Sequence, residues 1–346
     1  MIGFRLDVNE DVATGHIMRC IAIAKKIQEF GEECVFLLAD GRNIDILEKN
    51  KMKYHVLNIP WQDWDAGVDV VKQSVQDYQI ELLIVDSYVV TSTFFEKVNA
   101  MVPIFYIDDM CNCAFDVSIV LHYSQWQEET TLQELYKGRE VKLLSGMKYM
   151  PLRDEFEPSK LESKRKKRIM ITTGGTDPFH ITLDVVKYIL QEIKLRDYEC
   201  VAILGKMNED KQKLDVLAET TPRLTVLQNI SNMAEIMKDS CMAVSAGGTS
   251  IYELCACQTP TVCVAFAEDH VAFAEKMQQH EILYYAGDVR ENKNNVEKRI
   301  IKCLVKLAND EEKRKLFQHN METIVDGKGA QRIAGYVYNY IKSKKC

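Results

Sequence analysis

The sequence predicts an α/β protein made of two domains, each built around a parallel sheet. With 346 residues, the chain is too long for one small core. In both halves short apolar strands alternate with amphipathic helices, and this alternation lapses once, between Glu155 and Arg168. Because strands connected through helices pair in parallel and are covered on both faces, we expect ligands at the carboxyl ends of the strands.

The N-terminal half begins with an apolar strand from Ile2 to Asp7 and a helix from Gly15 that ends near Gly31. Apolar residues recur along this helix at three-and-four spacing, at Ile17, Cys20, Ile21, Ala24 and Ile27. The elements expected after it, in chain order, are a strand over 34–39, a helix near 44, a strand over 54–57, a helix over 65–78, and strands over 82–86 and 104–107.

A linker is expected where the periodicity lapses, and we read its basic run, 164–168, as solvated surface. The predicted domains are therefore residues 1–156 and 157–330, with a C-terminal helix over 331–346 that crosses back to the first domain. The strands expected in the second half lie over 169–171, 200–204, 224–227, 242–244 and 262–264. The helices expected there begin at 181, run through 214, lie near 233–237, begin at 250 and run over 329–342.

Composition narrows the function classes. The 44 basic and 51 acidic residues give a net charge of -7, which argues against a broad nucleic-acid or membrane-surface footprint and favours small-molecule partners. Neither a membrane-spanning stretch nor a signal peptide is visible, so we expect a cytoplasmic protein. The eleven cysteines are dispersed and lie mostly in apolar runs, which indicates reduced buried thiols. No zinc spacing is present, and we expect neither a metal nor another cofactor.

Polar residues follow several predicted strands. Gly15-His16 opens the first helix, where free backbone N–H groups favour an anion and bias a histidine toward the neutral form that accepts a proton. The alternative is a glycine N-cap beside a solvent-exposed histidine. Asp86-Ser87-Tyr88 and Asp108-Asp109 end two other strands, and helix capping or turn formation is the alternative for each of them.

Two glycine-rich junctions in the second half lie between a strand and a helix. They contain Gly174-Gly175 and Gly247-Gly248-Thr249, and such glycines let backbone amides approach phosphate oxygens, although a tight turn is the alternative. Glu253, one turn into the following helix, is placed to bind the two hydroxyls of a ribose. Neither junction fits the dinucleotide or Walker spacing, which disfavours a nicotinamide enzyme or an ATPase.

These motifs together carry a family resemblance over nearly the whole chain. The segments are 15–20, 86–88, 107–109, 149–156, 174–178, 246–249 and 252–255. The order and spacing of these segments resemble those of the hydrolases of pseudaminic acid biosynthesis, which remove UDP from 2,4-diacetamido-2,4,6-trideoxy-β-L-altropyranose. That family is related to spore-coat polysaccharide proteins and to MurG-type glycosyltransferases.

The resemblance implies a GT-B architecture, in which two Rossmann-like domains enclose a cleft and no metal is needed. It implies that the C-terminal domain holds the nucleotide and the N-terminal domain faces the sugar. His16 matches the base that activates water. The expected substrate-binding residues are Gly15, Arg19, Tyr88 and Asp269, and the expected nucleotide-binding residues are Gly174, Gly247, Gly248, Thr249 and Glu253.

Two positions depart from the family pattern. Relatives commonly carry an Asn-Gln pair where this chain has Asp269-His270, and an acidic side chain beside a diphosphate or acetamido group is unfavourable unless it is paired. His122 stands where relatives often have an acidic residue. These departures bear either on the identity of the substrate or on the details of the active site.

The expected activity is hydrolysis of a UDP-linked diacetamido trideoxy sugar, by attack of water at the anomeric carbon with inversion, as a step in glycan biosynthesis. The first alternative is a GT-B glycosyltransferase that uses a similar nucleotide sugar, and the missing amphipathic membrane helix disfavours it. The second is a nucleotide-sugar binding protein without catalysis, in which His16 would be dispensable. The sequence makes no prediction of oligomeric state.

Overall fold

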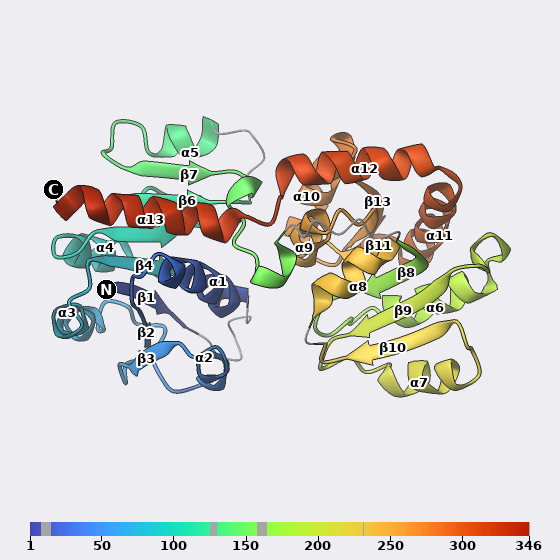
Figure 1. The fold of residues 1–346 in the computed structure, drawn as a ribbon, viewed down its shortest axis with the longest axis horizontal. Helices are drawn as coiled ribbons and strands as arrows, with labels where there is room; N and C mark the ends of the chain where they lie inside the picture. Colours follow the sequence, from blue (N-terminus) through green and yellow to red (C-terminus); the bar gives the residue numbers. More distant parts are fainter. Residues whose placement is uncertain (8–14, 125–129, 158–164, 231, 346) are drawn as a thin grey trace. The chain divides into compact units, whose positions relative to one another are not determined.

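The computed structural model describes residues 1–7, 15–124, 130–157, 165–230 and 232–345. The chain divides into two compact units (Figure 1). The first unit contains Met1–Asp154 and Gly327–Cys346, and the second contains Glu155–Asp326.

The first unit contains a seven-stranded sheet in which every pair of neighbouring strands is parallel. The strand order is β3-β2-β1-β4-β5-β6-β7. The strands are β1 (Ile2–Leu6), β2 (Cys34–Leu38), β3 (Lys53–Val56), β4 (Leu82–Asp86), β5 (Ile104–Ile107), β6 (Ile119–His122) and β7 (Lys142–Ser145). The chain runs from β1 through β2 to β3 on one side of the sheet and then crosses to β4 on the other side of β1. The carboxyl ends of β1 and β4 therefore form the topological switch point, where ligands bind in open α/β sheets.

Helices cover the sheet of the first unit on both faces. Its helices are α1 (Gly15–Glu29), α2 (Asp45–Lys49), α3 (Val68–Asp77), α4 (Ser92–Asn99), α5 (Thr130–Leu135) and α13 (Gly329–Lys345), with a short 3-10 helix, η1 (Met147–Tyr149). Val35 and Leu37 of β2 share an apolar cluster with α3 and α4, whereas the intervening Phe36 stacks on Phe4. The C-terminal α13 packs along α1, so the end of the chain belongs to the first unit (Figure 1).

The second unit contains a six-stranded parallel sheet in the order β10-β9-β8-β11-β12-β13. Its strands are β8 (Lys166–Thr172), β9 (Glu199–Leu204), β10 (Leu224–Gln228), β11 (Ser240–Ala246), β12 (Thr261–Ala265) and β13 (Leu283–Asp288). Its helices are α6 (Ile181–Gln191), α7 (Lys211–Glu219), α8 (Met233–Asp239), α9 (Ser250–Ala256), α10 (Glu268–Gln279), α11 (Val289–Asn309) and α12 (Glu311–Ile324), with the 3-10 helix η3 (Ile193–Leu195). Another 3-10 helix, η2 (Asp154–Phe156), lies where one unit passes into the other. The switch point of this sheet lies between β8 and β11.

The predicted alternation of strands and helices is confirmed in both units, but the basic run needs a correction. The expectation of solvated surface is wrong for Arg165, because its guanidinium binds acceptors near the C-terminal ends of α8 and α9. Those acceptors are the carbonyls of Met237, Lys238, Ser240, Cys257 and Gln258 and the hydroxyl of Thr259. Carbonyls at helix C-termini lack intrahelical partners and attract a cation. The next residue, Lys166, already belongs to β8.

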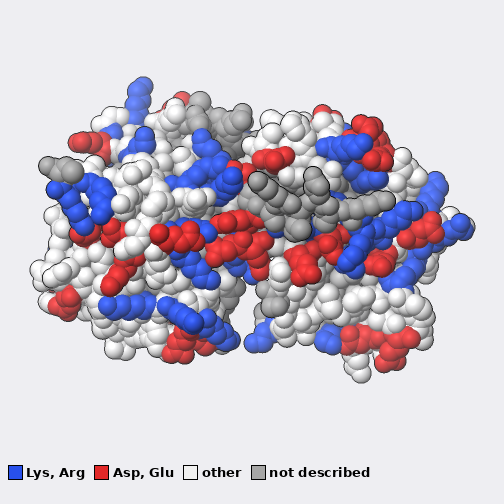
Figure 2. Space-filling model, in the orientation of Figure 1, with Lys and Arg blue, Asp and Glu red and all other residues white. Residues whose placement is uncertain are grey.

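Acidic and basic side chains are interspersed over the face shown in Figure 2, in agreement with the mixed charge of the composition. No helix within the described ranges is both long and apolar enough to cross a membrane.

Candidate functional site

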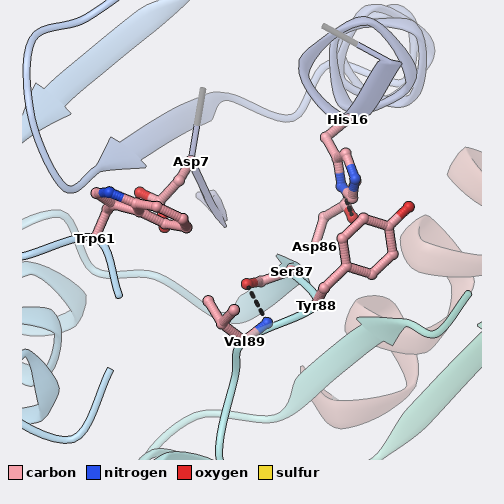
Figure 3. A pocket seen from close by; sticks show the side chains of 7 residues that line it. All are labelled: Asp7, His16, Trp61, Asp86, Ser87, Tyr88 and Val89. Carbon is pink, nitrogen blue, oxygen red and sulfur yellow. Dashed lines mark hydrogen bonds and ion pairs between the residues drawn. The ribbon is translucent and has the colours of Figure 1, made fainter. Parts of the chain in front are cut away.

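A pocket of about 140 Å³ lies at the switch point of the first unit (Figure 3). Its lining comes from the carboxyl end of β1, the first turn of α1, the loop after β3 and the residues that end and follow β4. The lining residues are Asp7, His16, Trp61, Asp86, Ser87, Tyr88 and Val89. This unit therefore has a pocket at the carboxyl ends of its strands, where ligands were predicted to bind.

His16 is oriented by Asp86. Its Nδ1 lies 2.6 Å from Asp86 Oδ1, and the imidazole is only 5% exposed, so the alternative of a solvent-exposed histidine is wrong. Since a carboxylate oxygen can only accept, Nδ1 carries the proton and donates it to Asp86, which leaves the lone pair on Nε2. This assignment gives His16 the tautomer of a base held by a buried carboxylate.

Arg19 holds the carboxylate that orients His16. Its Nε lies 2.6 Å from Asp86 Oδ2, and its Nη1 lies 2.6 Å from Asp109 Oδ2 and also donates to the hydroxyl of Tyr123. Its Nη2 donates to Asp86 Oδ1 and faces His16 Nδ1 at 3.1 Å. The N–H groups of Arg19 are thus engaged by neighbouring side chains, and Arg19 is not among the residues that line the pocket. The contacts indicate that it positions other residues.

Charge is balanced within this cluster. Burial alone would raise the pKa of Asp86, but Arg19 and His16 outweigh it and hold the pKa of this carboxyl well below its usual range. Burial alone would lower the pKa of Arg19, but Asp86, Tyr123 and Asp109 outweigh it and raise the pKa. Asp86 therefore stays ionised and is able to stabilise a positive charge on His16.

Tyr88 covers the imidazole. Its ring packs edge-on against that of His16 at a centroid distance of 4.6 Å, and its hydroxyl donates to Asp109 Oδ2 at 3.2 Å. Burial and the neighbouring Asp109 raise the pKa of Tyr88 to about 12, so the hydroxyl remains protonated. The ring is 56% exposed and provides a surface that a ligand can contact.

The structure supports the capping or turn alternative for several other polar residues. Asp108 Oδ1 accepts from the backbone N–H groups of Met110 and Cys111, and Ser87 Oγ accepts from the N–H of Val89. His122 Nδ1 bonds the carbonyl of Asp108. His122 therefore ties β6 to the turn after β5 and does not line the pocket.

Sequence reasoning missed three lining residues, Asp7, Trp61 and Val89. Asp7 follows β1 directly, just as Asp86 ends β4, so its position at a strand end was an available signal. Trp61 lies in the loop between β3 and α3 and shows no periodicity that would single it out. Gly15, which was expected to bind substrate, is exposed at the start of α1 and does not line the pocket.

The glycine junctions of the second unit follow β8 and β11, the two strands at its switch point. A Cβ atom on Gly247 would lie 2.8 Å from the Cβ of His270, whereas a Cβ on Gly248 would meet nothing within 4 Å. Gly247 is therefore required by packing inside the protein. Gly248 is not, and the space above its backbone is open. Thr249 is exposed beside it, and Glu253 lies in the first turn of α9.

Of the two residues that depart from the family pattern at this position, His270 contacts the glycine loop after β11, whereas Asp269 is exposed. Asp269 is exposed in the first turn of α10. His270 packs against Gly247, and its Nδ1 accepts from the backbone N–H of Phe266 at 3.3 Å. Burial lowers the pKa of His270, so the neutral ring carries its proton on Nε2. The acidic side chain that departs from the family pattern thus points to solvent.

At the Gly174-Gly175 junction, the backbone conformation explains one of the two glycines. Gly174 has a φ of +89°, a conformation that favours glycine, and a Cβ on Gly205 would lie 2.1 Å from the carbonyl oxygen of Gly175. Asp177 caps α6, because its carboxylate accepts from the N–H groups of Ile181 and Thr182 at 3.0 and 2.8 Å. The turn alternative accounts for Gly174 without a ligand, whereas a Cβ on Gly175 would meet nothing within 4 Å.

Comparisons with known proteins point to one superfamily. Residues 169–332 match the model of the glycosyltransferase family 28 C-terminal domain. An uncharacterized protein of Methanocaldococcus jannaschii is 24% identical over 71% of this chain, which spans about half (52%) of that relative's length. The spore coat polysaccharide biosynthesis protein SpsG of Bacillus subtilis is 23% identical over 41% of this chain and 42% of its own length. The UDP-2,4-diacetamido-2,4,6-trideoxy-beta-L-altropyranose hydrolase of Campylobacter jejuni is 22% identical over 72% of this chain and 86% of its own length.

Solved structures show the fold. MurG of Acinetobacter baumannii has a TM-score of 0.66 over 98% of this chain and 99% of its own, at 11% identity. A glycosyltransferase from Rickettsia africae has a TM-score of 0.64 over 98% of both chains, at 14% identity. The two parallel-sheet units are thus those of the GT-B fold, and the predicted fold class is confirmed.

Proposed function

We propose that this chain is a nucleotide-sugar hydrolase that releases UDP from a UDP-linked diacetamido trideoxy sugar, a step in the biosynthesis of a nonulosonic acid such as pseudaminic acid. The observation that carries the proposal is the pairing of His16 with Asp86 in the pocket at the carboxyl ends of β1 and β4. A histidine whose Nδ1–H is held by a buried, ionised carboxylate is a base poised at Nε2.

In the proposed reaction, His16 Nε2 takes a proton from water while the water oxygen bonds to the anomeric carbon. The bond from that carbon to the diphosphate oxygen breaks, and its electron pair leaves with UDP. Attack on the face opposite the leaving group inverts the anomeric centre. Asp86 stabilises the imidazolium that forms, and Arg19 keeps Asp86 ionised and in place.

Nucleoside diphosphate is already a competent leaving group, so the proposal needs no metal or other cofactor. We assign nucleotide binding to the domain of residues 157–330, through Gly174, Gly247, Gly248, Thr249 and Glu253, and the sugar site to residues 1–156. The open space at Gly248 supports an approach of phosphate to the backbone. The Nε2–H of His270 is a further donor beside Gly247.

The four expected substrate contacts have different roles in this proposal. Tyr88 lines the sugar site, and Arg19 acts through Asp86. Gly15 and Asp269 are both exposed, and they remain proposed contacts to the substrate. The name of the Campylobacter jejuni relative supports UDP as the nucleotide and a diacetamido sugar as the substrate, and a cytoplasmic location fits a sugar-nucleotide substrate.

A glycosyltransferase of the same architecture is the second candidate. The match to the family 28 C-terminal domain favours it, and in that reaction His16 would deprotonate an acceptor hydroxyl in place of water. A binding protein without catalysis is the third, and it would leave the His16–Asp86 pair without a role.

Incubation of the protein with a panel of UDP-linked amino sugars and no acceptor tests the proposal. Release of free UDP from one of them in the absence of any acceptor is the expected result. Release only after an acceptor sugar or lipid is added would instead support the transferase.

A further inference from the structure

Asp7 is a buried carboxylate that the proposed reaction leaves without a role. Its side chain is 6% exposed. Oδ1 accepts from Arg5 Nη1 at 2.7 Å and from the backbone N–H of Ala39 at 3.1 Å. Oδ2 is buried and has no hydrogen-bond partner among the residues that the structure describes. Buried polar atoms are nearly always paired, and an unpaired one destabilises the folded state.

The carboxylate is fixed in this orientation. Arg5 is 1% exposed, and its guanidinium stacks over the ring of Trp64 at 4.2 Å, while Nη1 also donates to the carbonyl of Leu6 at 2.9 Å. A rotation of Asp7 that satisfied Oδ2 would break the bonds that Oδ1 makes to Arg5 and Ala39. The contacts of Arg5 and Ala39 therefore hold the carboxylate at the end of β1 with one oxygen unpaired.

Asp7 faces the pocket from the side opposite the histidine. Asp7 and Trp61 lie together on one side, and His16 and Tyr88 lie on the other (Figure 3). Val89, 40% exposed, completes the apolar part of the lining. The space is thus lined on this side by a carboxylate, an indole and an aliphatic side chain.

We propose that Asp7 Oδ2 accepts a hydrogen bond from the amide N–H of an N-acetylated sugar, and that the acetyl methyl packs against Trp61 and Val89. This inference rests on the proposed function for the sugar's place in the pocket. An amide N–H fits Asp7 better than a hydroxyl alone would, because an acetamido group carries the donor and a methyl for the apolar lining on one substituent. Asp7 is then a positioning and specificity residue, and His16 remains the base.

Asp7→Asn tests the inference. With the amide oxygen toward Arg5, the NH2 group would face the donor of the sugar, so two donors would meet. The first probe is N-acetyl-D-glucosamine, with D-glucose as the comparison, observed by saturation-transfer NMR on the acetyl methyl. Wild type should give a methyl signal that excess D-glucose does not suppress. Asp7→Asn should weaken binding by about tenfold or more, and Asp40→Asn, a paired carboxylate after β2 outside this pocket, should leave it unchanged.

A second readout separates positioning from proton transfer. With the UDP-sugar that wild type hydrolyses, Asp7→Asn should lower kcat/KM about tenfold to a hundredfold and keep the pH dependence of wild type. Unchanged sugar binding and kcat/KM would overturn the inference. Loss of the acidic limb of the pH profile would overturn it too, since Asp7 would then be the base.

Two further outcomes stay distinguishable. If wild type hydrolyses no UDP-sugar but binds N-acetyl-D-glucosamine through Asp7, the proposed function fails and the inference stands. If Asp7→Asn does not fold, Trp61→Ala decides, because Trp61 lies half-buried in a loop. An undiminished methyl signal in folded Trp61→Ala would then overturn the inference.

Discussion

His16 Nδ1 and Asp86 Oδ1 lie 2.6 Å apart, although 70 positions separate them in the chain. The pair forms because β1 and β4 are neighbours in the sheet, so the loop after β1 and the end of β4 meet at the switch point. The same contact fixes the tautomer of His16 and places its free nitrogen as the acceptor of a proton. The predictions below test this arrangement.

Asp86→Asn should cost most of the activity. An asparagine is able to donate to Nδ1, which would favour the tautomer with its proton on Nε2 and remove the base. Turnover should fall by about a thousandfold or more. Steady-state kinetics on the purified variant measures this, with Asp40→Asn as a matched carboxylate outside the pocket. Activity within tenfold of wild type would show that Asp86 does not set the tautomer.

Acid should destabilise the wild type through Asp86. Because the pKa of Asp86 is lowered in the folded state, the unfolded state binds more protons at acidic pH, and the free energy of unfolding rises with pH. This contribution is present above the unfolded pKa of about 3.9 and is lost as the pH falls from about 5 toward the folded pKa. Urea unfolding from pH 7 to pH 3 should show a smaller decline for Asp86→Asn than for wild type; equal slopes would contradict the prediction.

Arg19→Lys should lower kcat with little effect on KM. Lysine keeps the charge but cannot bind both oxygens of Asp86 and reach Asp109 as the guanidinium does. We expect turnover to fall about tenfold to a hundredfold, since the loss acts through the position of His16. A rise in KM at unchanged kcat would instead place Arg19 in direct contact with substrate.

The two glycines after β11 should respond differently to alanine. Gly248→Ala should fold normally, because its Cβ meets nothing within 4 Å, and it should weaken UDP binding if phosphate approaches the backbone there. Gly247→Ala should lower the melting temperature, because its Cβ would lie 2.8 Å from His270. Calorimetric titration with UDP and thermal melts measure both effects. Unchanged UDP affinity in Gly248→Ala and in Glu253→Ala would move the nucleotide site to the Gly174-Gly175 loop.

Much of the fold was predictable because its signals are local. The spacing of apolar residues predicts the strand Leu82–Asp86 and the helix from Gly15, and the structure contains both. The helix expected from Asp65 begins only at Val68, and the carboxylate of Asp65 accepts from the hydroxyl of Thr91, a residue far along the chain. Arg165 was misread for a similar reason, because its partners lie more than 70 positions away.

The site was predictable only in part. His16, Asp86 and Tyr88 stood out as polar residues at strand ends, and the structure brings them together. The contacts of His16 with Asp86 and Tyr88 could not be predicted from the sequence, because they depend on which strands are neighbours in the sheet. The engagement of Arg19 by two carboxylates and the unpaired oxygen of Asp7 are likewise properties of three-dimensional packing.

The central claim is that His16 removes a proton from water, and His16→Asn tests it most directly. Asparagine has a similar reach and cannot act as the base, so the variant should lose about a hundredfold or more in turnover and bind UDP nearly as well as wild type. Both quantities should be measured on one folded preparation, and NMR should identify the first anomer that wild type forms. The account predicts lost turnover, retained UDP affinity and an inverted anomer. Undiminished turnover, or retention at the anomeric carbon, would contradict it.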